Sequence, residues 1–212
     1  MKLKLKYILI PFTALTMLML SACSLTIKPE EQCNFVMNSL QQRVSWNQNL
    51  PINLYIHESF LNQPNKDEYM DALKKAMDAW TKSLGKELFV IAGVGISGPA
   101  NPQKDGMSGI YFMDTWEESK PTEQARTTIY WKGEQIVEGD IRINAKNFQF
   151  FTGDSLTTTA VDLQSLFTHE LGHLLGLSHD NQNGSVMNER LASGVTRRDI
   201  GNLDISSLKC EY

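Results

Sequence analysis

Three of the four histidines in this 212-residue chain fall within one run of eleven residues, His169-Glu170-Leu171-Gly172-His173-Leu174-Leu175-Gly176-Leu177-Ser178-His179. His169 and His173 are four residues apart, so on a helix their side chains share one face, about one turn from each other. Gly176 can end that helix with a positive φ angle, which lets the chain turn back toward the same face. The pattern therefore predicts a helix followed by a tight turn that brings three imidazoles together.

Three neutral imidazoles are suitable ligands for Zn²⁺, and three protein ligands leave one position open for water, as in catalytic zinc sites. Glu170 follows the first ligand directly and is not needed for binding the metal, so we interpret it as a general base. A core helix with hydrogen-bonded histidines is the alternative, and the clustering of His169, His173 and His179 disfavours it. The remaining histidine, His57, lies on a predicted strand and is interpreted as a packing residue.

The spacing His-Glu-x-x-His-x-x-Gly-x-x-His resembles the motif of the metzincin zinc peptidases. Met187, in Gly184-Ser185-Val186-Met187, resembles the Met-turn of that clan, an apolar floor beneath the histidines, and its short distance from His179 is similar to the matrixins. The resemblance implies a zincin catalytic domain that hydrolyses peptide bonds with zinc-activated water. It also implies a protein or peptide substrate extended along an edge strand, which we place at 126–131, and a specificity-pocket wall after Met187.

Two departures from the family pattern affect the expected metals. Arg142 lies in the strand where animal matrixins place a histidine that binds a second, structural zinc, so we expect one zinc ion. Calcium sites are common in the family, and the loop acids Asp105, Asp114 and Asp154 are candidate ligands, although a solvated carboxylate is the favoured interpretation of each. Asp180 follows His179, as in adamalysins, so the subfamily stays open.

The order of periodic segments predicts a layered α/β (α+β) domain with a mixed twisted sheet, an active-site helix and a C-terminal helix. Apolar residues at spacings of three and four indicate helices, and short alternating or β-branched runs indicate strands. Lys132-Gly133-Glu134 predicts a hairpin between the last two strands. We expect strands within 50–60, 88–92, 109–113, 126–131 and 135–144, and helices at 66–84, at 160–176 and from Thr196, where a Thr-x-x-Asp pattern can cap a helix.

The first 22 residues have the order of an export signal, with three lysines, an apolar run from Tyr7 to Leu20 and small residues at the end. Leu20-Ser21-Ala22-Cys23 resembles the lipobox of bacterial lipoproteins, which implies that Cys23 is acylated and begins the mature chain. Ser24 follows this cysteine directly, and by the bacterial lipoprotein sorting rule such a residue implies transport to the outer membrane. An ordinary signal peptide and an N-terminal membrane anchor are the alternatives. We expect a signal at 1–22, a tether at 23–49 and a peptidase domain at 50–212.

Cys33 and Cys210 form an even pair in an exported domain, which predicts a disulfide. An inhibitory Cys33 thiolate on the zinc is the alternative, but the residues around Cys33 do not resemble a cysteine switch. The net charge of the whole chain is −4, and the signal carries three lysines and no acid, so the mature domain is more acidic still. This argues against a nucleic-acid partner, and we expect a monomer.

Two functions of other classes compete with the peptidase. The first is an envelope-anchored binding protein with a vestigial zinc site, and the intact Glu170 argues against it, because zinc binding alone does not require that carboxylate. The second is a zinc hydrolase that acts on a non-peptide amide bond, and the sequence leaves it open.

Overall fold

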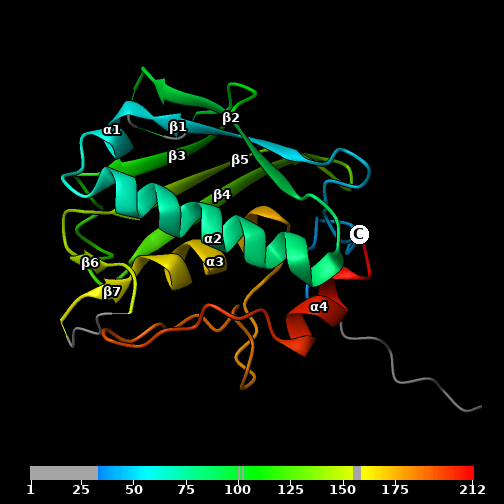
Figure 1. Cartoon of the computed structure of the whole chain (residues 1–212). Coiled ribbons are helices and arrows are strands. Elements are labelled where there is room, and N and C mark those ends of the chain that lie inside the picture. Colours follow the sequence, from blue (N-terminus) through cyan, green and yellow to red (C-terminus); the bar gives the residue numbers. More distant parts are fainter. Residues whose placement is uncertain (1–32, 100, 102, 155–158) are drawn as a thin grey trace, which may run out of the picture. The chain divides into compact units, whose positions relative to one another are not determined.

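A mixed sheet of five strands forms the frame of the domain (Figure 1). This computed structural model describes residues 33–99, 101, 103–154 and 159–212. The strands are β1 (Ile52–His57), β2 (Phe89–Ile96), β3 (Ser108–Met113), β4 (Ala125–Lys132) and β5 (Gln135–Asn144). Their order is β2-β1-β3-β5-β4, and β4 runs antiparallel to β5 whereas the other neighbours are parallel. β4 therefore forms one edge of the sheet.

Two long helices, α2 (Lys66–Leu84) and α3 (Leu163–Leu174), pack against each other on one face of this sheet (Figure 1). The ring of Phe112 in β3 joins both, with its centroid 5.4 Å from Tyr69 of α2 and 6.5 Å from Phe167 of α3. The predicted mixed sheet, with a helix that carries His169 and His173, is thus confirmed. Shorter elements are α1 (Glu58–Leu61), α4 (Asn202–Leu208) and the parallel pair β6 (Phe150–Phe151) and β7 (Val161–Asp162).

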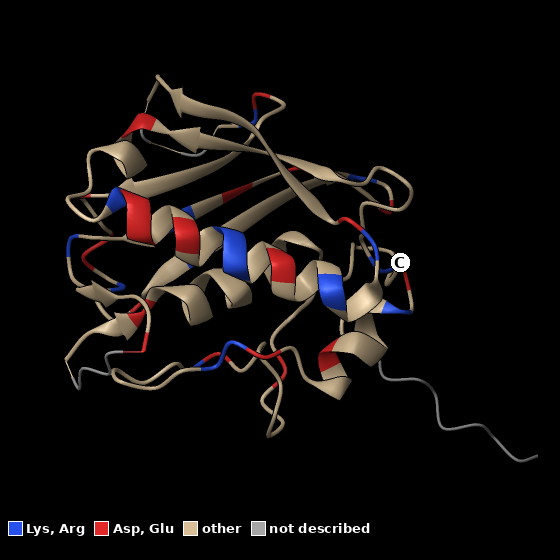
Figure 2. Cartoon of the chain, in the orientation of Figure 1, with Lys and Arg blue, Asp and Glu red and all other residues tan. Residues whose placement is uncertain are grey.

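The helix with the clearest sequence pattern, α2, has the predicted ends. Its buried side chains recur at spacings of three and four, which is the face that the helix turns to the core. Gly85 ends it with a φ of 65° and donates its N–H to the carbonyl of Thr81. The predicted hairpin is also present, with Gly133 at a φ of 62° between β4 and β5. Figure 2 shows that lysines and acids are both distributed along α2.

The active-site helix begins later than predicted because Val161 and Asp162 pair with β6. Asp162 is the N-cap of α3, where its carboxylate accepts from the N–H of Ser165 at 3.1 Å. Arg198 donates to both oxygens of this carboxylate, at 2.6 and 2.8 Å. The start of α3 is therefore fixed to the chain that leads to α4.

The prediction of a helix from Thr196 is wrong, because α4 begins six residues later, at Asn202. The intervening chain is held by tertiary contacts: the N–H of Arg197 donates to Ser165 Oγ, and Arg198 binds Asp162. Asp204, and not Asp199, caps the helix, with its carboxylate accepting from the N–H of Gly201 at 2.9 Å.

The segment 33–49, which we expected to be part of a tether, contributes side chains to the core of the domain. Phe35, Val44 and Trp46 are buried in the main core. The Trp46 indole N–H donates to the carbonyl of Leu174 at the end of α3, at 2.7 Å. The predicted signal and the lipobox with Cys23 lie outside the described residues.

A disulfide joins Cys33 to Cys210, which are 177 residues apart in sequence and have Cα atoms 6.0 Å apart. Cys33 thus lies beside the C-terminal end of α4. Because its sulfur is bonded to Cys210, it is not a free thiolate that could bind the metal. Among the described residues, no helix is long and apolar enough to cross a membrane.

Candidate metal centre

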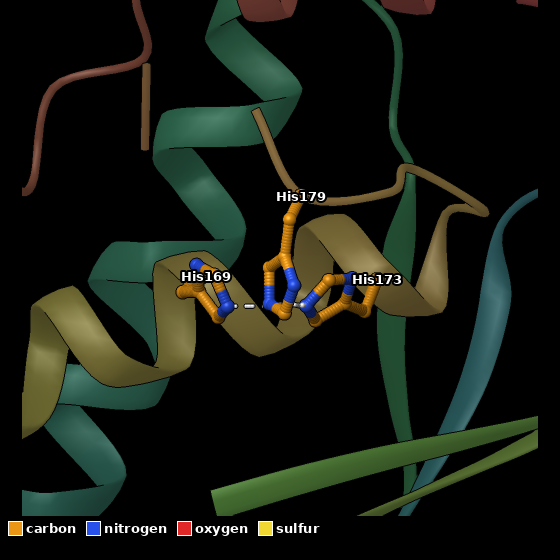
Figure 3. Close-up of side chains that lie close together, drawn as sticks. All are labelled: His169, His173 and His179. Atoms are coloured by element: carbon orange, nitrogen blue, oxygen red, sulfur yellow. Dashed lines mark hydrogen bonds between the residues drawn. The ribbon is translucent and has the colours of Figure 1, made fainter. Parts of the chain in front are cut away.

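The three predicted histidines converge on one point (Figure 3). His169 and His173 project from α3, and His179 comes from the loop that follows it. His173 Nε2 lies 3.1 Å from His169 Nε2 and 3.1 Å from His179 Nε2. Within the described part of the chain, this is the one group of three or more His, Cys, Asp or Glu side chains that is close enough to hold a metal ion.

The spacing of these nitrogens fits zinc. Ligand bonds of 2.0–2.1 Å at tetrahedral angles place neighbouring nitrogens about 3.3 Å apart, close to the 3.1 Å observed. The opposite ring nitrogen of two ligands contacts a backbone carbonyl: His169 Nδ1 lies 2.9 Å from Val186 O, and His173 Nδ1 lies 2.8 Å from Leu177 O. Because a carbonyl only accepts, Nδ1 carries the proton and Nε2 keeps its lone pair for the metal.

Burial prepares two of these imidazoles for metal binding. Desolvation lowers the pKa of His169 and that of His173 to about 4. Both rings are therefore neutral at neutral pH, which is the form that binds a metal ion. His179 is exposed, so the metal centre opens to solvent on its side.

The turn after α3 depends on Gly176. Its φ of 98° is in the left-handed region, and its N–H donates to the carbonyl of His173 at 2.9 Å. A Cβ atom at this position would lie 2.4 Å from the carbonyl oxygen of Val44. Glycine is thus required both for the backbone angle and for the close approach of the segment 33–49, and the turn directs His179 back toward α3.

Met187 lies directly beneath the α3 backbone. A Cβ atom on Gly172 would lie 2.3 Å from Met187 Sδ and 2.9 Å from Cζ2 of Trp80. Trp80 also donates its indole N–H to the carbonyl of Thr168 at 2.8 Å. The glycine inside the histidine motif therefore lets the helix that carries two ligands rest on Met187 and Trp80.

Asp204 of α4 holds the loop that contains Met187. Its buried carboxylate accepts from Ser185 Oγ at 2.6 Å and from the N–H of Val186 at 3.0 Å. Val186 in turn offers its carbonyl to His169 Nδ1. The C-terminal helix thus fixes a metal ligand through two successive hydrogen bonds.

Glu170 is 4% exposed and belongs to the lining of a cleft of about 790 Å³ that also contains the three histidines. Its Oε2 accepts a hydrogen bond from Thr127 Oγ1 at 2.6 Å. Burial raises the pKa of Glu170, and His173 and the Thr127 hydrogen bond oppose this rise. The cleft is also lined by residues 122–127, from β4 and the loop before it, and by residues 186 and 188–192.

A family model described as matrixin matches residues 45–212 of this chain. The chain belongs to the matrixin family. Shorter stretches match metalloendoproteinases of Arabidopsis thaliana. Metalloendoproteinase 2-MMP is 40% identical over 55 residues, which span 26% of this chain and 15% of that protein. Metalloendoproteinase 1-MMP is 43% identical over 49 residues, 23% of this chain and 14% of that protein.

Arg142 lies at the strand position that we compared with the second zinc site of animal matrixins. In this matrixin the position belongs to an ionic cluster. Arg142 pairs with Glu117 at 3.3 Å, and Arg126 pairs with Glu117 at 2.9 Å and also with Glu123. Both guanidinium groups lie over the ring of Trp116, at 5.1 and 5.8 Å from its centroid. Two cations and two carboxylates therefore occupy this outer face of the sheet.

The candidate calcium ligands do not come together. Asp105 Oδ1 accepts from the N–H of Met107, Asp114 is exposed, and Asp154 is an exposed partner of Arg198. Asp105, Asp114 and Asp154 are absent from the metal-holding group found among the described residues, which contains only the three histidines.

Thr127 and Asp204 are functional neighbours of this matrixin site that the sequence analysis did not single out. Thr127 contacts Glu170 across 43 residues of sequence, and Asp204 contacts Val186 across 18. The position of Thr127 in a predicted edge strand was the available indication, but only the register of β4 against the helix shows which of its residues meets Glu170.

Proposed function

We propose that this matrixin is a zinc-dependent endopeptidase that hydrolyses peptide bonds, with Glu170 as general base. The observation that carries the proposal is the convergence of His169, His173 and His179 through their Nε2 atoms, beside a buried carboxylate that is not one of the ligands. Three ligands leave a coordination position open, which is typical of catalytic zinc.

Zinc held by these histidines would supply Lewis acidity, which lowers the pKa of a water and polarises the scissile carbonyl. Glu170 lines the same cleft, so its carboxylate can accept the proton of that water. The same carboxyl group then donates the proton to the leaving amine. Burial raises the pKa of Glu170, which suits the first transfer, because a carboxylate of higher pKa is a stronger base toward the water.

The substrate class follows from the edge strand. β4 has β5 on one side, and among the described strands it has no partner on the other. An extended peptide can add to this edge by backbone hydrogen bonds, while its side chains enter the cleft lined by β4 and by residues 186 and 188–192. The curated relatives named metalloendoproteinases support a peptide substrate, although each match spans about 15% of their length.

The test compares wild type with Glu170→Ala. The variant is expected to keep about one zinc ion per chain and to lose at least about 100-fold in cleavage of an unstructured protein. Metal analysis and peptide-fragment mass spectrometry measure the two outcomes, and Glu118→Ala, at an exposed position, is the control. Full activity of Glu170→Ala would remove this residue from the mechanism. If the wild type binds zinc and cleaves nothing, the result favours the alternative of a binding protein with a vestigial zinc site. If it cleaves only a non-peptide amide bond, the result favours the alternative of a zinc hydrolase of such bonds.

We further propose that the chain is exported and acylated at Cys23, as a lipoprotein of the bacterial outer membrane. The support is the order of basic residues, apolar run and Leu20-Ser21-Ala22-Cys23, together with a disulfide, which is typical of oxidising compartments. In bacteria grown with radiolabelled palmitate, the wild-type protein is expected to carry label and to fractionate with the outer membrane. Cys23→Ala is expected to carry none. Label on both proteins, or on neither, contradicts the acylation of Cys23.

A further inference from the structure

Thr127 connects the edge strand to the carboxylate of Glu170. Its Oγ1 lies 2.6 Å from Glu170 Oε2 and 3.1 Å from the backbone carbonyl of the same residue. The shorter contact is to the carboxylate, which is the stronger acceptor. Within the described part of the chain, the structure records no second hydrogen-bond donor to this carboxylate.

One hydrogen bond of this kind fixes the rotation of a carboxylate. The last torsion of a glutamate side chain is broad and roughly two-fold, so packing alone defines it poorly. With Oε2 held by Thr127, the other oxygen stays available to accept a proton. The residue that holds Glu170 also lies on the strand to which an extended substrate would add, so one strand orients both the peptide and the base.

The alternation of side chains along β4 places Thr127 on the helix-facing side of the sheet. Ala125 and Ile129, two residues before and after it, belong to or pack against the main core. Arg126 lies on the opposite face, over Trp116. Thr128 shares the face of Arg126 by the same alternation, so two adjacent threonines face opposite sides.

We propose that Thr127 is a positioning residue that orients the Glu170 carboxylate for proton transfer. This inference rests on the proposed function. A purely structural role, as a joint between β4 and α3, predicts a different outcome: loss of the hydroxyl would lower stability and leave the turnover of folded enzyme unchanged.

The experiment compares Thr127→Val, which removes the hydroxyl and keeps the shape, with Thr127→Ser, which keeps the hydroxyl. Thr127→Val is expected to lower kcat about 10- to 100-fold, as for other small misplacements of a catalytic group, with little change in KM and with zinc content at the wild-type level. Thr127→Ser is expected to stay within about threefold of the wild-type kcat, since its hydroxyl can make the same bond. Thr115→Val, at an exposed threonine that does not line the cleft, is the control and is expected to behave as wild type.

A double variant separates the two proposals. If Thr127 acts through Glu170, adding Thr127→Val to Glu170→Ala lowers the residual activity no further. A kcat of Thr127→Val within twofold of wild type overturns the positioning role, and so does an equal loss in Thr127→Ser. In either case the proposed function is still supported as long as the wild type cleaves peptides and this cleavage depends on zinc and on Glu170.

Discussion

At the scale of single residues, the histidine motif is constrained by packing as well as by metal binding. Gly172 has no side chain, and an added Cβ would lie 2.3 Å from Met187 Sδ and 2.9 Å from Cζ2 of Trp80. Gly176 is constrained by its φ of 98°. The two glycines of the motif thus fix how closely α3 approaches its support and where its chain turns.

Gly172→Ala is expected to destabilise the domain by about 1–3 kcal/mol, the usual cost of overpacking a core. Because Met187 or α3 must shift, the variant is also expected to release zinc faster to a chelator. Denaturant unfolding and chelator-competition kinetics measure the two effects. Gly98→Ala is the control, since no atom lies within 4 Å of a Cβ at that exposed glycine. A Gly172→Ala protein as stable as wild type would show that this contact relaxes freely.

At the scale of elements, the regular part of the fold was predictable and the irregular part was not. The periodic helix α2, the hairpin of β4 and β5 and the segment that carries His169 and His173 all follow local spacing rules. The start of α4 does not, because the capping pattern at Thr196 competes with the contacts of Arg197 and Arg198 to the beginning of α3. At this position the tertiary contacts of Arg197 and Arg198 outweigh the local preference of the sequence for a helix.

The segment 33–49 was interpreted as part of a tether because its composition is polar and mixed. In the structure it is held by isolated pairings to distant chain, Phe35 with Leu177 and Ser45 with Gln135. Asn34 also donates through Nδ2 to the carbonyl of His179 at 2.9 Å. Contacts of this kind depend on the finished fold, and so does the bond from Thr127 to Glu170. The ligands were therefore predictable, and the residues that position them were not.

At the scale of the whole molecule, the disulfide joins the first described residue to the C-terminal helix end. Cross-linking residues so far apart restricts the unfolded chain, and loops of 100 residues or more correspond to about 4–5 kcal/mol in the chain-entropy model. Asn34 follows Cys33 directly and contacts the loop of His179, so this restraint also reaches a metal ligand.

The variant with both Cys33→Ser and Cys210→Ser is expected to lose about 2–5 kcal/mol of stability, the usual range for removing a native disulfide. Its zinc dissociation is expected to be faster than that of wild type, because Asn34 is less firmly held against His179. Urea unfolding with and without a reductant measures the first effect, and wild type in reductant should approach the variant. Equal stability in all three samples would contradict the prediction.

The same covalent link closes the backbone between Cys33 and Cys210 into a ring. A single cut of the backbone inside this ring releases no fragment and adds only the mass of one water molecule. On an electrophoresis gel the two pieces would separate only under reducing conditions. For the proposed peptidase, a cut made by another copy of the protein would thus leave the two pieces joined to each other.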